Sequence, residues 1–216
     1  MFLSKTIFFD YDGTIHDSFV IYAPALRKAV AWLVDGGHIS PMEIDDDLIR
    51  SFLGKNPMAM WQEFLPDVEE DVRQKASAIV SSNMNQMIED GHAIWYPNAK
   101  DTLLYLKDKG YRLIFISNCK TYYKEAHDKV FNLSALFDQL LASEDFNYIA
   151  KEVIIDEVMG SFELPAIVIG DRLVDITAGR AHGFKTIGCL YGYGSKEELK
   201  DADVWIDDIA QLKDLM

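Results

Sequence analysis

The chain begins with a short apolar run that ends directly in two carboxylates. Residues 6–9 are typical of a buried strand, Asp10 and Asp12 follow at once, and Gly13 marks a turn. Two acids placed so close together repel each other unless a cation or a shared proton holds them. A solvated Asp-Gly turn is the simpler interpretation, but it does not explain why both acids continue a buried strand. We therefore expect a functional site at the end of this strand.

Strand-like and helical segments alternate beyond residue 96. We expect strands over 113–116, 139–142, 166–169, 185–188 and 204–206, and helices over 98–109, 121–132, 151–159 and 175–182. Such alternation predicts a parallel sheet with helices on both of its faces. The first strand must join this sheet, because an isolated strand cannot bury itself. The predicted fold class is therefore α/β, a Rossmann-like parallel sheet.

The segment 17–91 contains no convincing strand. Its apolar spacing predicts helices over 25–34, 45–53 and 69–89, with Pro24 beginning or kinking the first of them. We expect this segment to be an all-helical cap inserted after the first strand, above the strand ends. The predicted domains are thus a core of residues 1–16 and 92–216 and a cap of residues 17–91.

The overall charge narrows the range of partners. The 216 residues carry a formal net charge of −14, which argues against nucleic acid and anionic membrane surfaces and leaves a divalent cation as a ligand. No apolar run reaches the roughly 18 residues of a membrane span, and no leader-like segment stands at the N-terminus. Cys119 and Cys189 lie beside apolar runs and are expected to be buried small hydrophobes. We expect a cytoplasmic protein.

Polar side chains follow four of the predicted strands. They lie at the carboxyl ends, which converge on one crevice in a parallel sheet: Asp10 and Asp12, Ser117 and Asn118, Lys151, and Asp171 and Asp175. A carboxylate cluster selects a hard cation such as Mg²⁺. One carboxylate can attack a phosphorus atom, a second can move protons, and a hydroxyl and a lysine can neutralise the transferring group. The set predicts phosphoryl transfer.

The same residues resemble the motifs of a known superfamily. Residues 9–18, with Asp10-x-Asp12-Gly13-Thr14, and the later Gly170-Asp171 are similar to haloacid-dehalogenase-like (HAD) phosphatases of the phosphoglycolate-phosphatase and β-phosphoglucomutase branch. The resemblance extends to residues 96–98, 137–138 and 183–188, and so to nearly the whole chain. It implies the same α/β core and an inserted helical cap.

The resemblance also implies different roles for the first two acids. Asp10 would be the nucleophile and a metal ligand. Asp12 would be the general acid/base, and its backbone carbonyl would reach the metal. Because a halide leaves without a proton and an alkoxide does not, Asp12 favours phosphate esters over haloacids.

The remaining motif residues receive roles in the same way. Ser117 would hydrogen-bond the phosphoryl group, and Lys151 would join that group to Asp10. Asp171 would ligate Mg²⁺, and Asp175 would ligate the ion or orient its water shell. Lys151 lacks the proline that usually follows the family's third-motif lysine, so Lys120 and Lys124 stay open as alternatives.

A second group of residues concerns substrate choice. Arg50 and Lys55 lie in the cap, where the family places residues that select the substrate, and Asn118 follows Ser117. We therefore include these three as candidate substrate-binding residues, with solvated surface side chains as the alternative. The histidines, including His16 and His127, show no metal-ligand spacing and are expected to be structural.

The predicted function is Mg²⁺-dependent hydrolysis of small phosphate monoesters, such as phosphoglycolate or a sugar phosphate, through an aspartyl-phosphate. The partner is then a small phosphorylated metabolite, and the protein a monomer or homodimer. A β-phosphoglucomutase-type phosphotransferase uses the same core and is the alternative. A receiver-like or non-catalytic phosphate-binding module fits less well, because receivers are near 120 residues and need no lid.

Overall fold

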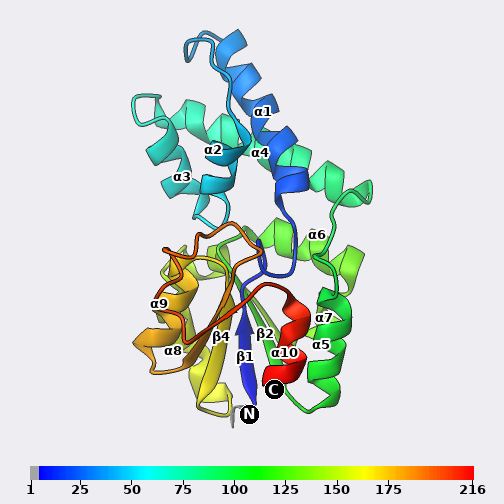
Figure 1. Ribbon diagram of the computed structural model, residues 1–216. Coiled ribbons are helices and arrows are strands. Elements are labelled where there is room, and N and C mark those ends of the chain that lie inside the picture. The colour runs from blue at the N-terminus through cyan, green and yellow to red at the C-terminus, as the bar shows by residue number, and fades with distance from the viewer. Residues whose placement is uncertain (1–4) are drawn as a thin grey trace.

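The computed structural model describes residues 5–216 and is built on one parallel sheet. Six strands lie in the order β3-β2-β1-β4-β5-β6, with helices on both sides of the sheet (Figure 1). The strands are β1 (Thr6–Phe9), β2 (Arg112–Ser117), β3 (Gln139–Ala142), β4 (Ala166–Gly170), β5 (Lys185–Cys189) and β6 (Val204–Ile206). The predicted α/β class with a parallel sheet is confirmed.

The first strand lies in the middle of the sheet. Phe9, its last residue, is in register with Phe115 of β2 and Ile169 of β4. Successive side chains point to opposite faces, so Phe8 packs in one apolar cluster while Ile7 and Phe9 pack in the other. A strand buried on both faces explains why the sequence here is apolar without alternation.

Helices cover each face of the sheet. One face carries α8 (Lys151–Val158) and α9 (Leu173–Ala181). The other carries α5 (Ala99–Asp108), α6 (Thr121–Phe131), α7 (Leu133–Leu136) and α10 (Leu212–Leu215). Three short 3₁₀ turns complete this part: η1 (Ser143–Phe146), η2 (Met159–Ser161) and η3 (Ile209–Gln211).

Four helices stand apart from the sheet, beyond the carboxyl ends of its strands (Figure 1). They are α1 (Phe19–Asp35), α2 (Asp46–Phe52), α3 (Pro57–Phe64) and α4 (Glu70–Glu89). α4 buries one stripe at helical spacing, with Ala76, Val80 and Met84 among its members. α1 is the helix that packs most extensively against it. These helices fall inside the predicted cap segment, whose boundaries at residues 17 and 91 stay a prediction.

Two of these helices differ from the sequence prediction. α1 begins at Phe19, six residues earlier than expected, and contains Pro24 in its interior. Pro24 removes one backbone hydrogen bond, but the buried side chains around it hold the turn in place, so packing outweighs propensity. α3 was not predicted. Asn56 begins it, because its side chain accepts hydrogen bonds from the backbone N–H groups of Met58 and Ala59.

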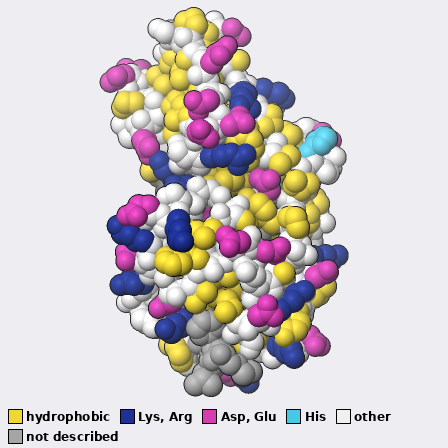
Figure 2. All heavy atoms as spheres, in the orientation of Figure 1, with side chains coloured by type: hydrophobic (Ala, Val, Ile, Leu, Met, Phe, Trp, Pro, Cys, Tyr) yellow, Lys and Arg dark blue, Asp and Glu magenta, His cyan; other side chains and the backbone are white. Residues whose placement is uncertain are grey.

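Charged side chains of both signs lie on the surface. On the face shown in Figure 2, acidic and basic side chains are interspersed. None of the helices in residues 5–216 combines the length and the apolar character needed to cross a bilayer. Cys119 and Cys189 are buried free thiols, as predicted.

Buried side chains on the central strands contribute to the free energy of unfolding. Ile167 on β4 is fully buried between the sheet and its helices, so Ile167→Ala leaves a cavity and is expected to lower the free energy of unfolding by about 2–5 kcal/mol. Urea denaturation measures this loss. Val153→Ala, at an exposed position of α8, is the control and should change stability by less than about 0.5 kcal/mol. Equal losses in both variants would contradict this view of the core.

Candidate active site

The carboxyl edge of the sheet brings the predicted polar side chains together. The backbone N–H of Asp10 still donates to the carbonyl of Ile169 at 2.8 Å, so Asp10 continues the pairing of β1 with β4. Ser117 is the last residue of β2, and Lys151 is the first residue of α8. Asp171 follows β4, and Asp175 lies in the first turn of α9. Side chains more than 100 positions apart in sequence therefore meet at one edge.

Three of these side chains form a buried acidic cluster. Asp10, Asp171 and Asp175 are at most 3% exposed, and each offers a carboxylate oxygen within 4.8 Å of the others. Burial and the charge of Asp175 raise the pKa of Asp10 well above its usual range. The same two causes raise the pKa of Asp171 to about 7. The cluster therefore favours any positive charge that enters it.

Lys151 supplies part of that charge. Its ammonium group donates to Oδ1 of Asp10 and, at 2.6 Å, to Oδ1 of Asp175. Burial alone would lower the pKa of Lys151, but the two carboxylates outweigh it and raise this pKa above its usual range. One ammonium cannot balance three carboxylates, and Oδ2 of Asp10 is buried without a hydrogen-bond partner. The donor set of carboxylate oxygens and this unpartnered atom fit a hard divalent cation.

Glycines allow the loops to approach the cluster closely. Gly13 has φ +90°, and a Cβ atom built on it would lie 2.2 Å from Oδ2 of Asp171. A side chain at this position would be strained and would displace the carboxylate. The nearby backbone N–H of Tyr193 donates to the same oxygen at 2.7 Å. The sequence indicates only a turn at Gly13. The structure shows that glycine is needed there, because a side chain would collide with the Asp171 carboxylate.

Asp12 lies outside the cluster and faces a cavity. The hydroxyl of Ser117 donates to its Oδ2 at 3.4 Å, and the hydroxyl of Tyr123 donates to its Oδ1 at 2.6 Å. A cavity of about 100 Å³ begins at this carboxylate and extends between the sheet and the helices α1–α4. Asp12 is therefore the carboxyl group of this edge that lines the cavity, whereas the three clustered acids do not.

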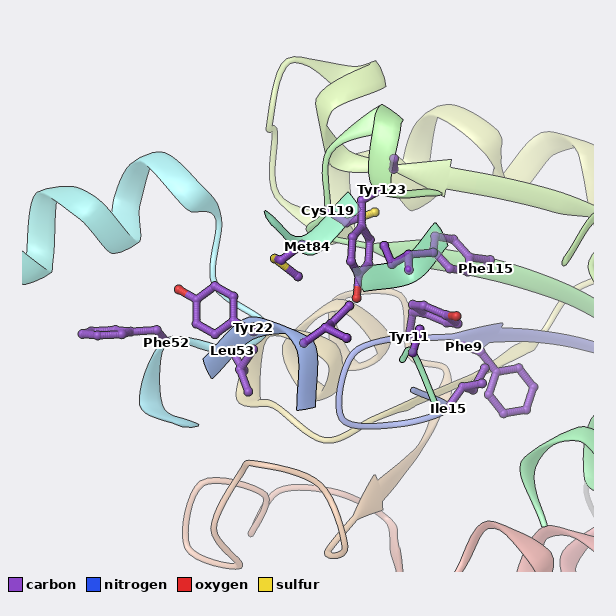
Figure 3. Packing of buried hydrophobic residues seen from close by; sticks show 14 of the residues in the cluster. Phe9, Tyr11, Ile15, Tyr22, Phe52, Leu53, Met84, Phe115, Cys119 and Tyr123 are labelled. Carbon is purple, nitrogen blue, oxygen red and sulfur yellow. The ribbon is translucent and has the colours of Figure 1, made fainter. Parts of the chain in front are cut away.

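The cavity is bounded mainly by apolar and aromatic side chains. Figure 3 shows Tyr22, Phe52 and Leu53 on one side and Cys119 and Tyr123 on the other. Asn118 and Lys55 also line it. The amide of Asn118 donates to the carbonyl of Gly54 at 2.9 Å, which joins the sheet edge to the loop after α2. Lys55 is paired with Glu63 at 2.7 Å.

The other candidate cations have partners outside the acidic cluster. Arg50 is absent from the cavity lining and places its guanidinium 3.8 Å from the centroid of the Phe19 ring. Lys120 lines the cavity and donates to the hydroxyls of Ser77 and Ser81 on α4. Lys124 is paired with Asp145. Of the three lysines left open by the sequence, Lys151 is the one that contacts Asp10.

Sequence reasoning missed two side chains that contact Asp12. Tyr123 lies on α6, and nothing in its sequence context distinguishes it from the neighbouring Tyr122. His16 was expected to be structural, yet its Nδ1 lies 3.4 Å from Oδ1 of Asp12. Its position four residues after Asp12 was the available signal, but only the tight turn at residues 12–16 brings the two side chains together.

Cation binding to the acidic cluster should stabilise the fold. Mg²⁺ at 100 times its dissociation constant is expected to stabilise by about 2.7 kcal/mol, a rise in Tm on the order of 5–10 °C for a chain of this size. Asp171→Asn should abolish most of this rise, whereas Asp67→Asn, at an exposed position, should keep it. Thermal unfolding with and without EDTA makes the measurement. An undiminished rise in Asp171→Asn would place the cation elsewhere.

Known phosphatases are similar to this chain over most of its length. A phosphoglycolate phosphatase of Haemophilus influenzae (strain ATCC 51907 / DSM 11121 / KW20 / Rd) is 25% identical over 228 aligned residues, which cover 98% of each chain. The enzyme of the same name from Aquifex aeolicus (strain VF5) is 27% identical over 198 residues, covering 88% of this chain and 86% of that one.

Solved structures share the fold. A predicted phosphoglycolate phosphatase from Haemophilus somnus 129PT superposes with a TM-score of 0.87 at 22% identity, covering 100% of this chain and 99% of that one. CbbY from Rhodobacter sphaeroides, in complex with phosphate, gives 0.80 at 19% identity, covering 97% and 96%. The family model described as haloacid dehalogenase-like hydrolase matches residues 7–189. The chain belongs to the haloacid dehalogenase-like hydrolase family.

Proposed function

We propose that this protein is a Mg²⁺-dependent phosphatase that hydrolyses small phosphate monoesters through an aspartyl-phosphate on Asp10. The observation that carries this proposal is the acidic cluster of Asp10, Asp171 and Asp175, which Lys151 joins through Asp10 and Asp175, two residues along the chain from the cavity-lining Asp12. A nucleophile, a cation site and a separate proton donor then lie within one site. The names of the curated relatives support the same reaction.

In the first half-reaction a carboxylate oxygen of Asp10 attacks phosphorus, and the bond to the ester oxygen breaks. The leaving alkoxide takes a proton from Asp12, which becomes a carboxylate. The Ser117 hydroxyl, 3.4 Å from Asp12, would donate to a phosphoryl oxygen. The ammonium group of Lys151, already in contact with Asp10, would neutralise charge on the transferring group.

In the second half-reaction water attacks the phosphorus of the aspartyl-phosphate. Asp12 takes a proton from this water, and the bond from phosphorus to the Asp10 oxygen breaks. Inorganic phosphate leaves, and both acids return to their starting states. A single carboxyl group therefore serves as acid and then as base.

Mg²⁺ is the cation we propose for the cluster. Carboxylate oxygens are hard ligands, and Mg²⁺ is commonly held by one or two carboxylates together with phosphate oxygens and water. Asp10, Asp171 and the backbone carbonyl of Asp12 would be its ligands, with Asp175 ligating it or orienting its water. The bound ion supplies positive charge beside the phosphoryl oxygens.

The cavity supports a small metabolite as substrate. It lies between the core and the helices of residues 17–91, which we propose act as a cap that selects the alcohol half of the ester. Lys55 and Asn118 line it, whereas Arg50 does not. A cytoplasmic location and a monomeric or homodimeric state stay predictions. Release of free phosphate, rather than transfer to a second hydroxyl, distinguishes this proposal from the mutase alternative.

The nucleophile assignment is tested with p-nitrophenyl phosphate. Wild-type protein with Mg²⁺ is expected to release nitrophenolate and free phosphate, and EDTA should stop the reaction. Asp10→Asn should abolish turnover, because an amide cannot attack phosphorus, while circular dichroism should show an intact fold. Asp67→Asn serves as the matched control with unchanged rates. Wild-type rates in Asp10→Asn would refute the assignment.

The lysine assignment is tested by comparing three alanine variants. Lys151→Ala is expected to lower kcat/KM on the order of 10²-fold or more, since it removes the cation that faces the transferring group. Lys124→Ala, which loses the same charge at a site paired with Asp145, should stay within about threefold of wild type. Assays at saturating Mg²⁺ on protein checked for folding make the comparison. A large loss in Lys120→Ala together with a small one in Lys151→Ala would move the role to Lys120.

A further inference from the structure

A buried polar network surrounds the carboxyl group of Asp12. The Tyr123 hydroxyl, which donates to Oδ1 at 2.6 Å, also lies 3.0 Å from Nδ1 of His16. His16 is fully buried and Tyr123 is 4% exposed. Both side chains thus contact the same carboxylate oxygen from its protein side, while Oδ2 remains with Ser117 at the cavity.

The hydrogen-bond chemistry fixes the direction of this network. The Tyr123 hydroxyl has one proton, which goes to Asp12, so its oxygen can only accept from His16. Nδ1 of His16 must therefore carry the ring proton. Nε2 of His16 then has a bare lone pair, and it is buried without a partner. A buried ring nitrogen without a hydrogen-bond partner is costly. The fold carries this cost at Nε2 and keeps Nδ1 beside the Tyr123 hydroxyl and Asp12.

A second set of rings holds His16 in place. The Tyr11 ring stacks on His16 with centroids 5.3 Å apart, and the His127 ring meets it edge-on at 4.5 Å. Tyr11 accepts from Trp95 Nε1 at 3.0 Å and donates to Nδ1 of His127 at 2.7 Å. Burial lowers the pKa of His127 well below its usual range, so this ring stays neutral. Figure 3 shows Tyr11 and Tyr123 as members of the same buried cluster.

We infer that Tyr123 and His16 are positioning residues, which hold Oδ1 of Asp12 so that Oδ2 faces the leaving oxygen of the ester. The inference rests on the proposed function, because it assumes that Asp12 protonates that oxygen. The proton moves from Oδ2 of Asp12 to the alkoxide while Oδ1 keeps its hydrogen bonds. An aspartate without these bonds can rotate about its side-chain torsions, and a misplacement of about 1 Å can cost on the order of 10²-fold in rate.

The experiment compares two phosphate esters of similar size and different leaving groups. Benzyl phosphate releases an alkoxide that needs a proton, whereas p-nitrophenyl phosphate releases a stable phenolate that does not. Because kcat/KM reports the steps up to the first phosphoryl transfer, it isolates the protonation of the leaving group. Tyr123→Phe is expected to lower kcat/KM on the order of 10- to 100-fold for benzyl phosphate. For p-nitrophenyl phosphate the fall should stay below about threefold.

Tyr11→Phe is the matched control. It removes a buried tyrosine hydroxyl from the neighbouring ring set without touching Asp12. This variant should be less stable than the wild type. The ratio of its kcat/KM values for the two esters should equal the wild-type ratio. The inference would be overturned if Tyr123→Phe lowered kcat/KM equally for both esters, or if Tyr11→Phe changed the ratio of the two kcat/KM values as much as Tyr123→Phe does. Tyr123 would then have only a structural role.

A second pair of variants tests His16 separately. His16→Asn keeps an N–H group near the position of Nδ1, whereas His16→Leu removes it. The inference requires a larger loss on benzyl phosphate in His16→Leu than in His16→Asn, and equal losses would overturn it for this residue. Wild-type turnover of p-nitrophenyl phosphate and its loss in Asp10→Asn test the proposed function independently of these ratios.

Discussion

The contact of one buried lysine with two buried carboxylates is the interaction on which the site depends. Lys151 joins Asp10, at the end of β1, to Asp175, at the start of α9. Without a cation these acids and Asp171 would repel each other in a region shielded from water, where charge interactions are strong. The ammonium group balances only part of the negative charge. The remainder is the charge that, in the proposed function, a divalent cation would balance beside the phosphate group.

The sheet provides the geometry for this interaction. Because all six strands are parallel and β1 is central, polar residues that follow β1, β2 and β4 must lie at one edge. Asp10 and Asp171 follow neighbouring strands, and Gly13 and Gly192 leave the room that the Asp171 carboxylate occupies. The helices α1–α4 and their loops then line a cavity together with residues of this edge. In the proposed function these two places have separate tasks, with phosphate chemistry in the acidic cluster and contact with the alcohol half of the ester in the cavity.

Much of this arrangement was predictable from the sequence. The strands and the convergence of Asp10, Ser117, Lys151 and Asp171 followed from apolar periodicity and from residues placed at strand ends. The extension of α1 through Pro24 and the presence of α3 were not predicted, because packing and a local side-chain cap outweighed the propensity signals. Contacts of Asp12 with Tyr123 and His16 could not be predicted, since they depend on how α6 and a four-residue turn are oriented.

The sequence by itself determined the fold class, the strand-end acids and the choice of chemistry, because these depend on patterns along the chain. Only the tertiary structure decided which lysine meets Asp10, since three lysines were compatible with the spacing. It also decided that Arg50 lies against Phe19 and outside the cavity lining, while Lys55 and Asn118 line the cavity. Side-chain partners are set by the packing of distant segments, and no local pattern records that packing.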